Sequence, residues 1–179
     1  MEHGAQSLEH CTMRTRPAIL FVDTNILLDC PRPEDYRLPG RRVTVVVTPE
    51  VMRELRGLAR SRERGVAPAA MQSLAALETL SRRRGSAAGV PLGRSGTTIR
   101  VLPGESDDAT STDLRLVLRA REEQSRHREA LVAVVTRDWG VAELARGQGV
   151  KSVLIRRSAT TADLERGVAE HDTELDIDL

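Results

Sequence analysis

The chain has 179 residues, which is long enough for one well-buried domain and short for two. Aromatic residues make up only 2% of it, with one Trp, one Tyr and one Phe, so the core must be built from aliphatic side chains. This composition argues against a base-stacking surface of the kind that single-strand nucleic-acid binders use. The net charge of +1 excludes a molecule that is strongly basic as a whole.

The charge is unevenly distributed along the chain. Residues 52–100 contain ten arginines against three acids, a local balance of +7, whereas residues 162–179 contain seven acids against Arg166 alone. We interpret the acidic end as a solvated tail. For the arginine-rich stretch, a solvated surface and a phosphate-facing surface are equally good interpretations.

Cysteine content and hydropathy indicate a cytoplasmic protein. Cys11 and Cys30 are too few for a disulfide framework and show no CxxC spacing. Residues 1–16 are polar, without the apolar core of a signal peptide, and the longest apolar runs are far too short to span a bilayer. We therefore expect a reducing, cytoplasmic location and no membrane partner.

Residues 1–15 show no periodicity and are predicted to be disordered. Beyond them, short apolar runs alternate with helical patterns. The predicted strands are 17–22, 43–47, 98–102, 131–135 and 152–155. Their apolar residues are continuous rather than alternating, as expected of strands that helices cover on both faces.

The first long helix is predicted to begin at Thr48-Pro49-Glu50, where a capping hydroxyl precedes a proline and an acid. The predicted helices are 49–64, 67–83, 112–125, 139–147 and 161–168. The basic segment 82–97 is rich in Gly, Pro and Ser and is predicted to be a flexible loop. Strands and helices in alternation predict an α/β fold, a three-layer α/β/α sandwich with a central parallel β-sheet, over residues 16–157. Residues 158–179 would add a C-terminal helix and the acidic tail.

Polar side chains follow two strands of this predicted sheet. Asp23 and Asn25 come directly after the first strand, and Thr136 and Asp138 come directly after the LVAVV strand. Because ligands bind beyond the carboxyl ends of parallel strands, these residues are expected at one site. Each also has a purely structural interpretation, an Asx turn for Asp23 and Asn25 and a helix cap for Asp138.

Two further acids lie on predicted helices. Asp113 opens one helix, and Glu54 lies at the edge of the apolar stripe of another. Their structural interpretations are a first-turn acid favoured by the helix dipole and a surface ion pair between Glu54 and Arg53 or Arg56. Four acids from separate elements of one domain nevertheless favour a shared site.

A shared site of carboxylates favours a hard cation. Converging carboxylates repel one another, and Mg²⁺ or Mn²⁺ would neutralise them. Carboxylate and amide oxygens without a cluster of Cys or His select these metals. The four histidines of the chain show no zinc spacing.

The motifs that hold these acids resemble the PIN domain family of metal-dependent ribonucleases. They are FVDTNILLD at 21–29, TPEVxxEL at 48–55, DxxLxxxA at 113–120 and VVTxD at 134–138. The resemblance extends over about residues 17–155, most of the chain. It implies an endoribonuclease that hydrolyses RNA phosphodiester bonds with Mg²⁺ or Mn²⁺ as cofactor.

The resemblance also implies roles for individual residues. The catalytic acids would be Asp23, Glu54, Asp113 and Asp138. The metal ligands among them would be Asp23, Asp113 and Asp138, with Glu54 acting on a water. The residues that orient the acids would be Asn25 and Thr136. The residues that contact the RNA backbone would be Arg53, Arg56 and Arg60.

Two other folds with an acid after the first strand fit less well. A phosphatase of the haloacid-dehalogenase type needs a second Asp where Asn25 stands and a lysine in its site, whereas Lys151 begins the last strand. A two-component receiver domain needs a phosphoacceptor Asp after the third strand, where Leu102 is followed by Pro103 and Gly104. The chain also has no P-loop and no GxGxxG fingerprint.

The serious competitor is a PIN-like module that binds RNA or protein without cutting, or a toxin held silent by an antitoxin. The intact acids argue for catalysis, because a pure binding module has no need of a charge cluster that repels phosphate. The RNA target, the number of metal ions, homodimer formation and an antitoxin or other protein partner stay open. It also stays open whether Asp107 or Asp108 takes the place of Asp113.

Overall fold

A computed structural model describes residues 16–32, 42–83, 88–92, 96–104 and 111–155. The predictions for residues 1–15, for the helix at 161–168 and for the acidic tail fall outside these ranges. So do Asp107 and Asp108 and two parts of the predicted loop, 84–87 and 93–95.

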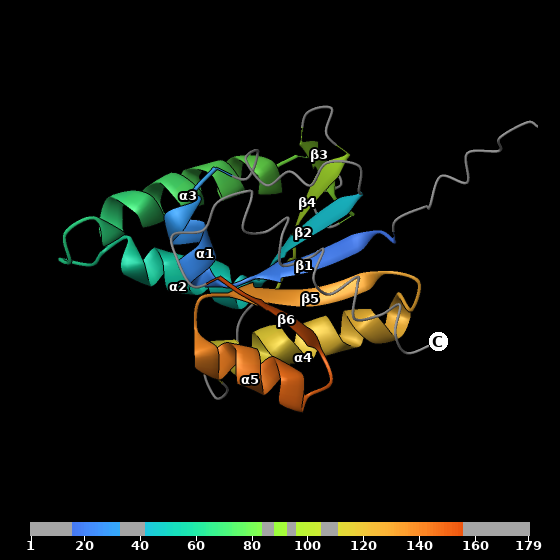
Figure 1. Ribbon diagram of the computed structural model, residues 1–179. Coiled ribbons are helices and arrows are strands. Elements are labelled where there is room, and N and C mark those ends of the chain that lie inside the picture. Colours follow the sequence, from blue (N-terminus) through green and yellow to red (C-terminus); the bar gives the residue numbers. More distant parts are fainter. Residues whose placement is uncertain (1–15, 33–41, 84–87, 93–95, 105–110, 156–179) are drawn as a thin grey trace, which may run out of the picture.

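The described chain forms six strands and five helices (Figure 1). The strands are β1 (Ala18–Val22), β2 (Val43–Val47), β3 (Val90–Leu92), β4 (Thr97–Val101), β5 (Leu131–Thr136) and β6 (Lys151–Leu154). The helices are α1 (Thr24–Asp29), α2 (Pro49–Leu58), α3 (Val66–Ser81), α4 (Thr112–Arg126) and α5 (Trp139–Gly147).

The sheet has the strand order β3-β4-β2-β1-β5-β6. All neighbouring strands are parallel except β3 and β4, which are antiparallel. Helix α1 packs against α3 and α4 packs against α5, and the two pairs flank the sheet on opposite sides (Figure 1). The predicted α/β sandwich is thus confirmed, with a sheet that is mostly rather than entirely parallel.

The central strands carry the core. All five residues of β1 and all six of β5 are buried, as their continuous apolar sequences predicted. Phe21, the only Phe of the chain, is 1% exposed, and the rest of the core is mainly Val, Leu, Ile and Ala. In the described ranges, no helix is both long and apolar enough to cross a membrane.

The structure differs from the sequence prediction within the segment 82–97. Residues 90–92 form an edge strand there instead of a loop, because Val90 and Leu92 are buried while Pro91 between them is exposed. A proline is compatible with an edge strand, since the missing amide removes no hydrogen bond from the sheet interior.

Helix lengths also differ from the prediction. Residues 24–29 form a helix that the apolar run alone did not reveal. Helix α2 ends at Leu58 rather than at 64, and turn hydrogen bonds from Arg60 N to Gly57 O and from Ser61 N to Leu58 O follow it. The charged residues after Ser61 offer no apolar stripe to bury, so packing gives no reason for the helix to continue.

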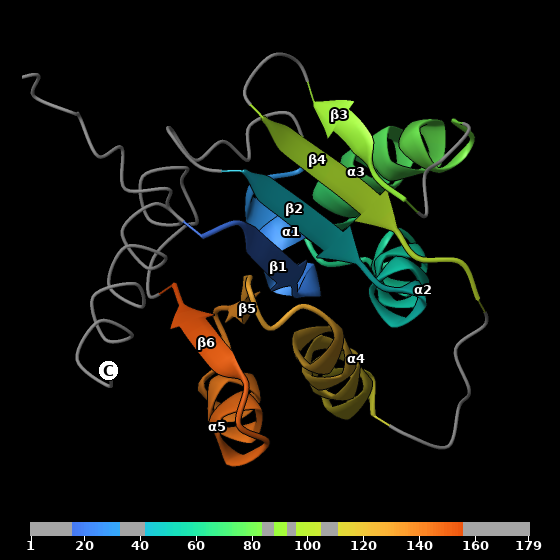
Figure 2. The same ribbon diagram turned by 90° about the vertical axis from the view of Figure 1, so that its right-hand side faces the viewer.

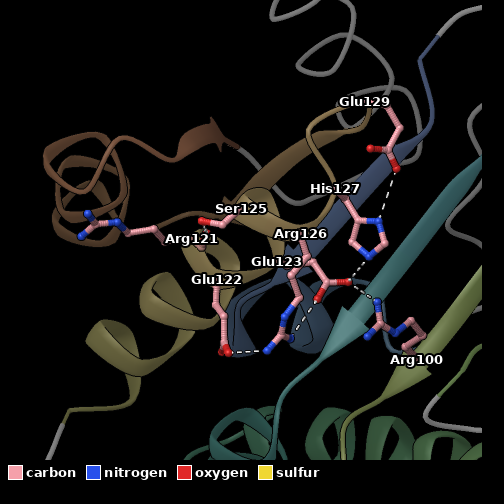
Figure 3. A network of polar contacts seen from close by, with 8 residues as sticks. All are labelled: Arg100, Arg121, Glu122, Glu123, Ser125, Arg126, His127 and Glu129. Carbon is pink, nitrogen blue, oxygen red and sulfur yellow. Dashed lines mark hydrogen bonds and ion pairs between the residues drawn. The ribbon is translucent and has the colours of Figure 1, made fainter.

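Polar contacts fix the carboxyl end of α4 (Figure 3). Glu123 is 5% exposed and forms an ion pair with Arg100 of β4. His127 Nε2 lies 3.5 Å from Glu123 Oε1, and Arg126 Nη1 lies 4.0 Å from its Oε2. This network holds the helix at the end opposite to Asp113.

The strand order reverses direction at β1. From β1 the chain proceeds to β2 and β4 on one side, and the later strands β5 and β6 lie on the other side (Figure 2). The carboxyl ends of β1 and β5 therefore meet at a switch point of strand order, where ligands bind in parallel α/β sheets. Asp23 and Asp138 follow these two ends.

Candidate metal centre

Asp23 lies at the end of β1 and is 5% exposed. Its Oδ1 accepts a hydrogen bond of 2.6 Å from the backbone N–H of Thr24, which caps helix α1. Its Oδ2 accepts two more, one of 2.6 Å from Thr136 Oγ1 and one of 2.7 Å from Asn25 Nδ2. Asp23 thus caps helix α1 through Oδ1, whereas its Oδ2 binds the side chains of Thr136 and Asn25.

Asn25 and Thr136 bind the strand ends together around Asp23. Asn25 Oδ1 accepts a hydrogen bond of 3.1 Å from the backbone N–H of Arg137. Thr136 Oγ1 donates to Asp23 and accepts from the backbone N–H of Asp138 at 2.9 Å. A single hydroxyl thus connects the acid that follows β1 to the acid that follows β5.

Glu54 contacts α1 rather than a neighbouring arginine. Thr24 Oγ1 donates a hydrogen bond of 2.8 Å to Glu54 Oε2, and the rest of the Glu54 side chain is exposed. Thr24 therefore connects two candidate site residues, with its amide on Asp23 and its hydroxyl on Glu54. It was not among the predicted site residues, although it stands inside the FVDTN motif.

Asp113 and Asp138 are both exposed. Asp113 is the second residue of α4 and lies in its first turn, which Ser111 caps by accepting a hydrogen bond from Leu114 N. Asp138 caps α5, its Oδ1 accepting from Gly140 N at 2.6 Å and from Val141 N at 3.4 Å. The structural interpretation of Asp138 is thus correct, and it uses Oδ1 alone.

The four acids interact through their charges. Burial raises the pKa of Asp23, hydrogen bonds from Thr136 and Thr24 oppose that rise, and the charges of Asp113 and Glu54 add to it. The pKa of Asp113 is raised by partial desolvation of its otherwise exposed carboxyl group and, to a smaller extent, by the charge of Asp138. Each acid therefore acts electrostatically on at least one of the others.

The side chains nonetheless do not form a ready-made set of ligands. Within the described ranges, no three side chains of the types His, Cys, Asp and Glu stand close enough together to hold a metal ion. Asp23 directs both oxygens at protein donors. The donor set itself, four carboxylates with a neighbouring amide, fits a hard cation such as Mg²⁺ or Mn²⁺.

A buried ion pair connects the two helices that carry Glu54 and Asp113. Glu50, on α2, is 0% exposed, and Arg119 of α4 donates to it from Nε at 3.1 Å and from Nη2 at 3.0 Å. Arg115 Nη1 lies 4.0 Å from the same carboxylate. Figure 2 shows α2 between α3 and α4, in the position that this pair supports.

The arginines predicted to contact RNA lie on and just after α2. Arg53 is half-buried, and Arg56 and Arg60 are exposed. Arg56 forms an ion pair of 3.8 Å with Glu78 of α3, so it points toward that helix.

The sequence matches the model of one protein family, described as the PIN domain, over residues 20–156. The chain belongs to the PIN domain family. PIN domains are generally nucleases and usually use divalent metals. The predicted resemblance and fold are therefore confirmed for most of the chain.

A solved structure has a similar fold. A domain of a functionally unknown protein from Methanocaldococcus jannaschii DSM 2661 is similar in structure, with a TM-score of 0.51 and 15% sequence identity. The similarity covers 80% of this chain and 94% of that one. A search of curated proteins gave no significant match.

Proposed function

We propose that this PIN domain is an endoribonuclease that hydrolyses RNA phosphodiester bonds with Mg²⁺ or Mn²⁺ bound at the carboxyl ends of β1 and β5. The observation that carries the proposal is the buried carboxylate of Asp23. Burial and the charges of Asp113 and Glu54 all act against its ionised form. A cation would remove both the repulsion and the cost of burying the charge.

Asp23, Asp113 and Asp138 would hold the ion. Asp138 would bind through Oδ2, because Oδ1 caps α5. Asn25 and Thr136 hold Asp23 in its orientation through the hydrogen bonds to Oδ2. When bound, a divalent ion supplies a water of lowered pKa and offsets charge on the attacked phosphate.

Glu54 would act as the general base that accepts a proton from the attacking water. Its Oε2 is occupied by the hydroxyl of Thr24, which leaves Oε1 to receive that proton. Arg56 and Arg60 would contact the RNA backbone. The ion pair of Arg56 with Glu78 joins two half-exposed groups and is weak, so Arg56 is able to turn toward a phosphate.

The first experiment measures cleavage of a labelled RNA with and without Mg²⁺ or Mn²⁺. We expect Asp23→Asn to abolish metal-dependent cleavage while the far-UV circular dichroism stays that of the folded protein. Glu54→Gln should lower the rate by about 100-fold or more. Glu122→Gln, a surface acid at the far end of α4, is the matched control and should cut like the wild type.

A second experiment separates a nuclease from a non-catalytic module. Mn²⁺ at about 100 times its dissociation constant should stabilise the wild type by about 2.7 kcal/mol, and Asp23→Asn should lose this gain. A wild type that neither gains stability from Mn²⁺ or Mg²⁺ nor cuts RNA would refute the proposal. That result would favour the alternative of a binding module.

A further inference from the structure

The one tryptophan of the chain is exposed beside the candidate metal centre. In the part of the chain that the structure describes, the exposed large apolar side chains are Met71, Leu118 and Trp139, and Trp139 is 56% exposed. It is the first residue of α5 and directly follows Asp138. An indole presents a large, flat face, and next to the candidate site residue Asp138 this face is available to stack on a base.

The position of Trp139 on α5 directs it away from the core. The residues that α5 buries are Val141, Ala142 and Ala145. As the first residue of α5, Trp139 stands at the amino end of this helix, beside the edge of the sheet where β5 ends. That edge carries Asp23 and Asp138.

The ring is held in place on one side. The guanidinium carbon of Arg146 lies 5.4 Å from the ring centroid of Trp139, a cation–π contact two helical turns away. Arg146 also pairs with Glu143 of the same helix. The guanidinium of Arg146 can cover only one face of the Trp139 ring. Because the residue is 56% exposed, ring surface is left on which a base can stack.

We propose that Trp139 stacks on a base of single-stranded RNA next to the phosphate that is cut. This inference rests on the proposed function and names its substrate class. A phosphate at Asp138 places an adjoining base within reach of the next residue, since neighbouring Cα atoms are only about 3.8 Å apart. A base stacks on an indole only when it is unpaired and splayed out, so the site selects single-stranded RNA.

A single aromatic ring can stack on one base and cannot stack on several successive bases. The low aromatic content of the chain argued against a base-stacking surface, and the one exposed indole provides a single stacking position rather than such a surface. We therefore expect one stacked base per site, with the remaining contacts made to phosphates.

The test uses the intrinsic fluorescence of the intact protein. Because the chain has one tryptophan, its emission reports on Trp139 alone. In EDTA, where cleavage is blocked, a single-stranded RNA of roughly ten nucleotides should quench this emission. A base-free oligomer of the same length and charge should leave it unchanged. Equal quenching by both oligomers, or by neither, would overturn the inference.

Variants give an independent readout of RNA binding by fluorescence anisotropy of a labelled RNA. Trp139→Leu should weaken binding of single-stranded RNA by about tenfold, and Trp139→Phe, which keeps an aromatic face, should weaken it less. Leu118→Ala removes an exposed apolar side chain on α4 and is the control, with no change expected. Equal affinities for the wild type and Trp139→Leu would contradict stacking.

The two proposals fail separately. If Asp23→Asn abolishes metal-dependent cleavage but RNA leaves the Trp139 emission unchanged, the stacking inference is wrong and the nuclease stands. If RNA with bases quenches the emission in a protein that never cuts, the stacking inference holds and the proposed nuclease activity is wrong.

Discussion

The buried ion pair between Glu50 and Arg119 gives the sharpest test of how α2 is held against α4. The carboxylate is 0% exposed, whereas the side chain of Arg119 is 31% exposed and that of Arg115 is 22% exposed. The two ends of the pair are therefore not equivalent. If Glu50 is removed, the guanidinium groups of Arg119 and Arg115 can be solvated by water. If Arg119 is removed, the carboxylate of Glu50 stays buried and cannot be solvated.

We predict that Arg119→Met destabilises the protein more than Glu50→Met does. Removing one partner of a buried pair costs about 3–5 kcal/mol when a charge stays buried without it. Arg115 at 4.0 Å offsets part of this cost, so we expect about 3 kcal/mol for Arg119→Met, or about 6–12 °C in Tm. For Glu50→Met, the loss of hydrogen bonds between charged groups should cost about 1.5–2 kcal/mol.

The difference should depend on pH. Burial alone would raise the pKa of Glu50, but hydrogen bonds from Arg119, from its own backbone amide and from Thr48 outweigh it, and the pKa lies below its ordinary value of 4.5. The pair therefore stabilises the wild type above pH 4.5, and this gain is lost as the pH falls through the lowered pKa. In Arg119→Met burial prevails, so the stability should no longer rise from pH 4 to pH 7.

Urea unfolding followed by circular dichroism at pH 4, 5, 6 and 7 measures both effects. The matched control is Arg126→Met on the same helix, which removes an exposed pair with Glu122 and a 4.0 Å contact with Glu123. It should cost at most about 1 kcal/mol, because Glu123 keeps its ion pair with Arg100. If Arg119→Met were as stable as Arg126→Met, or if its deficit were the same at every pH, the reasoning about the buried carboxylate would be wrong.

Two further changes test how Asp23 is held. Thr136→Val removes the hydroxyl that donates to Asp23 and accepts from Asp138 N. Urea unfolding should show that the free energy of unfolding falls by about 1.5–3 kcal/mol. Thr136→Ser keeps the hydroxyl and should be about as stable as the wild type. Ile26→Ala empties a fully buried site in α1, three residues after Asp23, and we expect a loss of about 2–5 kcal/mol together with weaker Mn²⁺ binding in a thermal-shift titration. Unchanged Mn²⁺ affinity would show that the packing of α1 does not support the carboxylate.

The sequence by itself determined five of the six strands, most helix starts and the places of the acids at strand ends. Continuous Val and Leu runs can be buried on both faces only in a sheet covered by helices, and Thr48-Pro49 begins a helix through its own side chain and ring. Asp23 and Asp138 were placed at strand ends for the same local reason. Such signals act within a few residues, so they are visible without the fold.

The tertiary structure alone decided the partners. Thr24 donates to a glutamate 30 residues away, and Arg119 binds Glu50 from 69 residues away, choices that depend on how α1, α2 and α4 pack. The burial of Val90 and Leu92, which makes β3 a strand, depends on the neighbouring edge of β4. The exposure of Trp139 likewise depends on which face of α5 the sheet covers. A local sequence pattern indicates which kinds of group a residue is able to contact. Only tertiary packing brings one particular partner within the few ångströms over which a hydrogen bond or a stacked ring stabilises the structure.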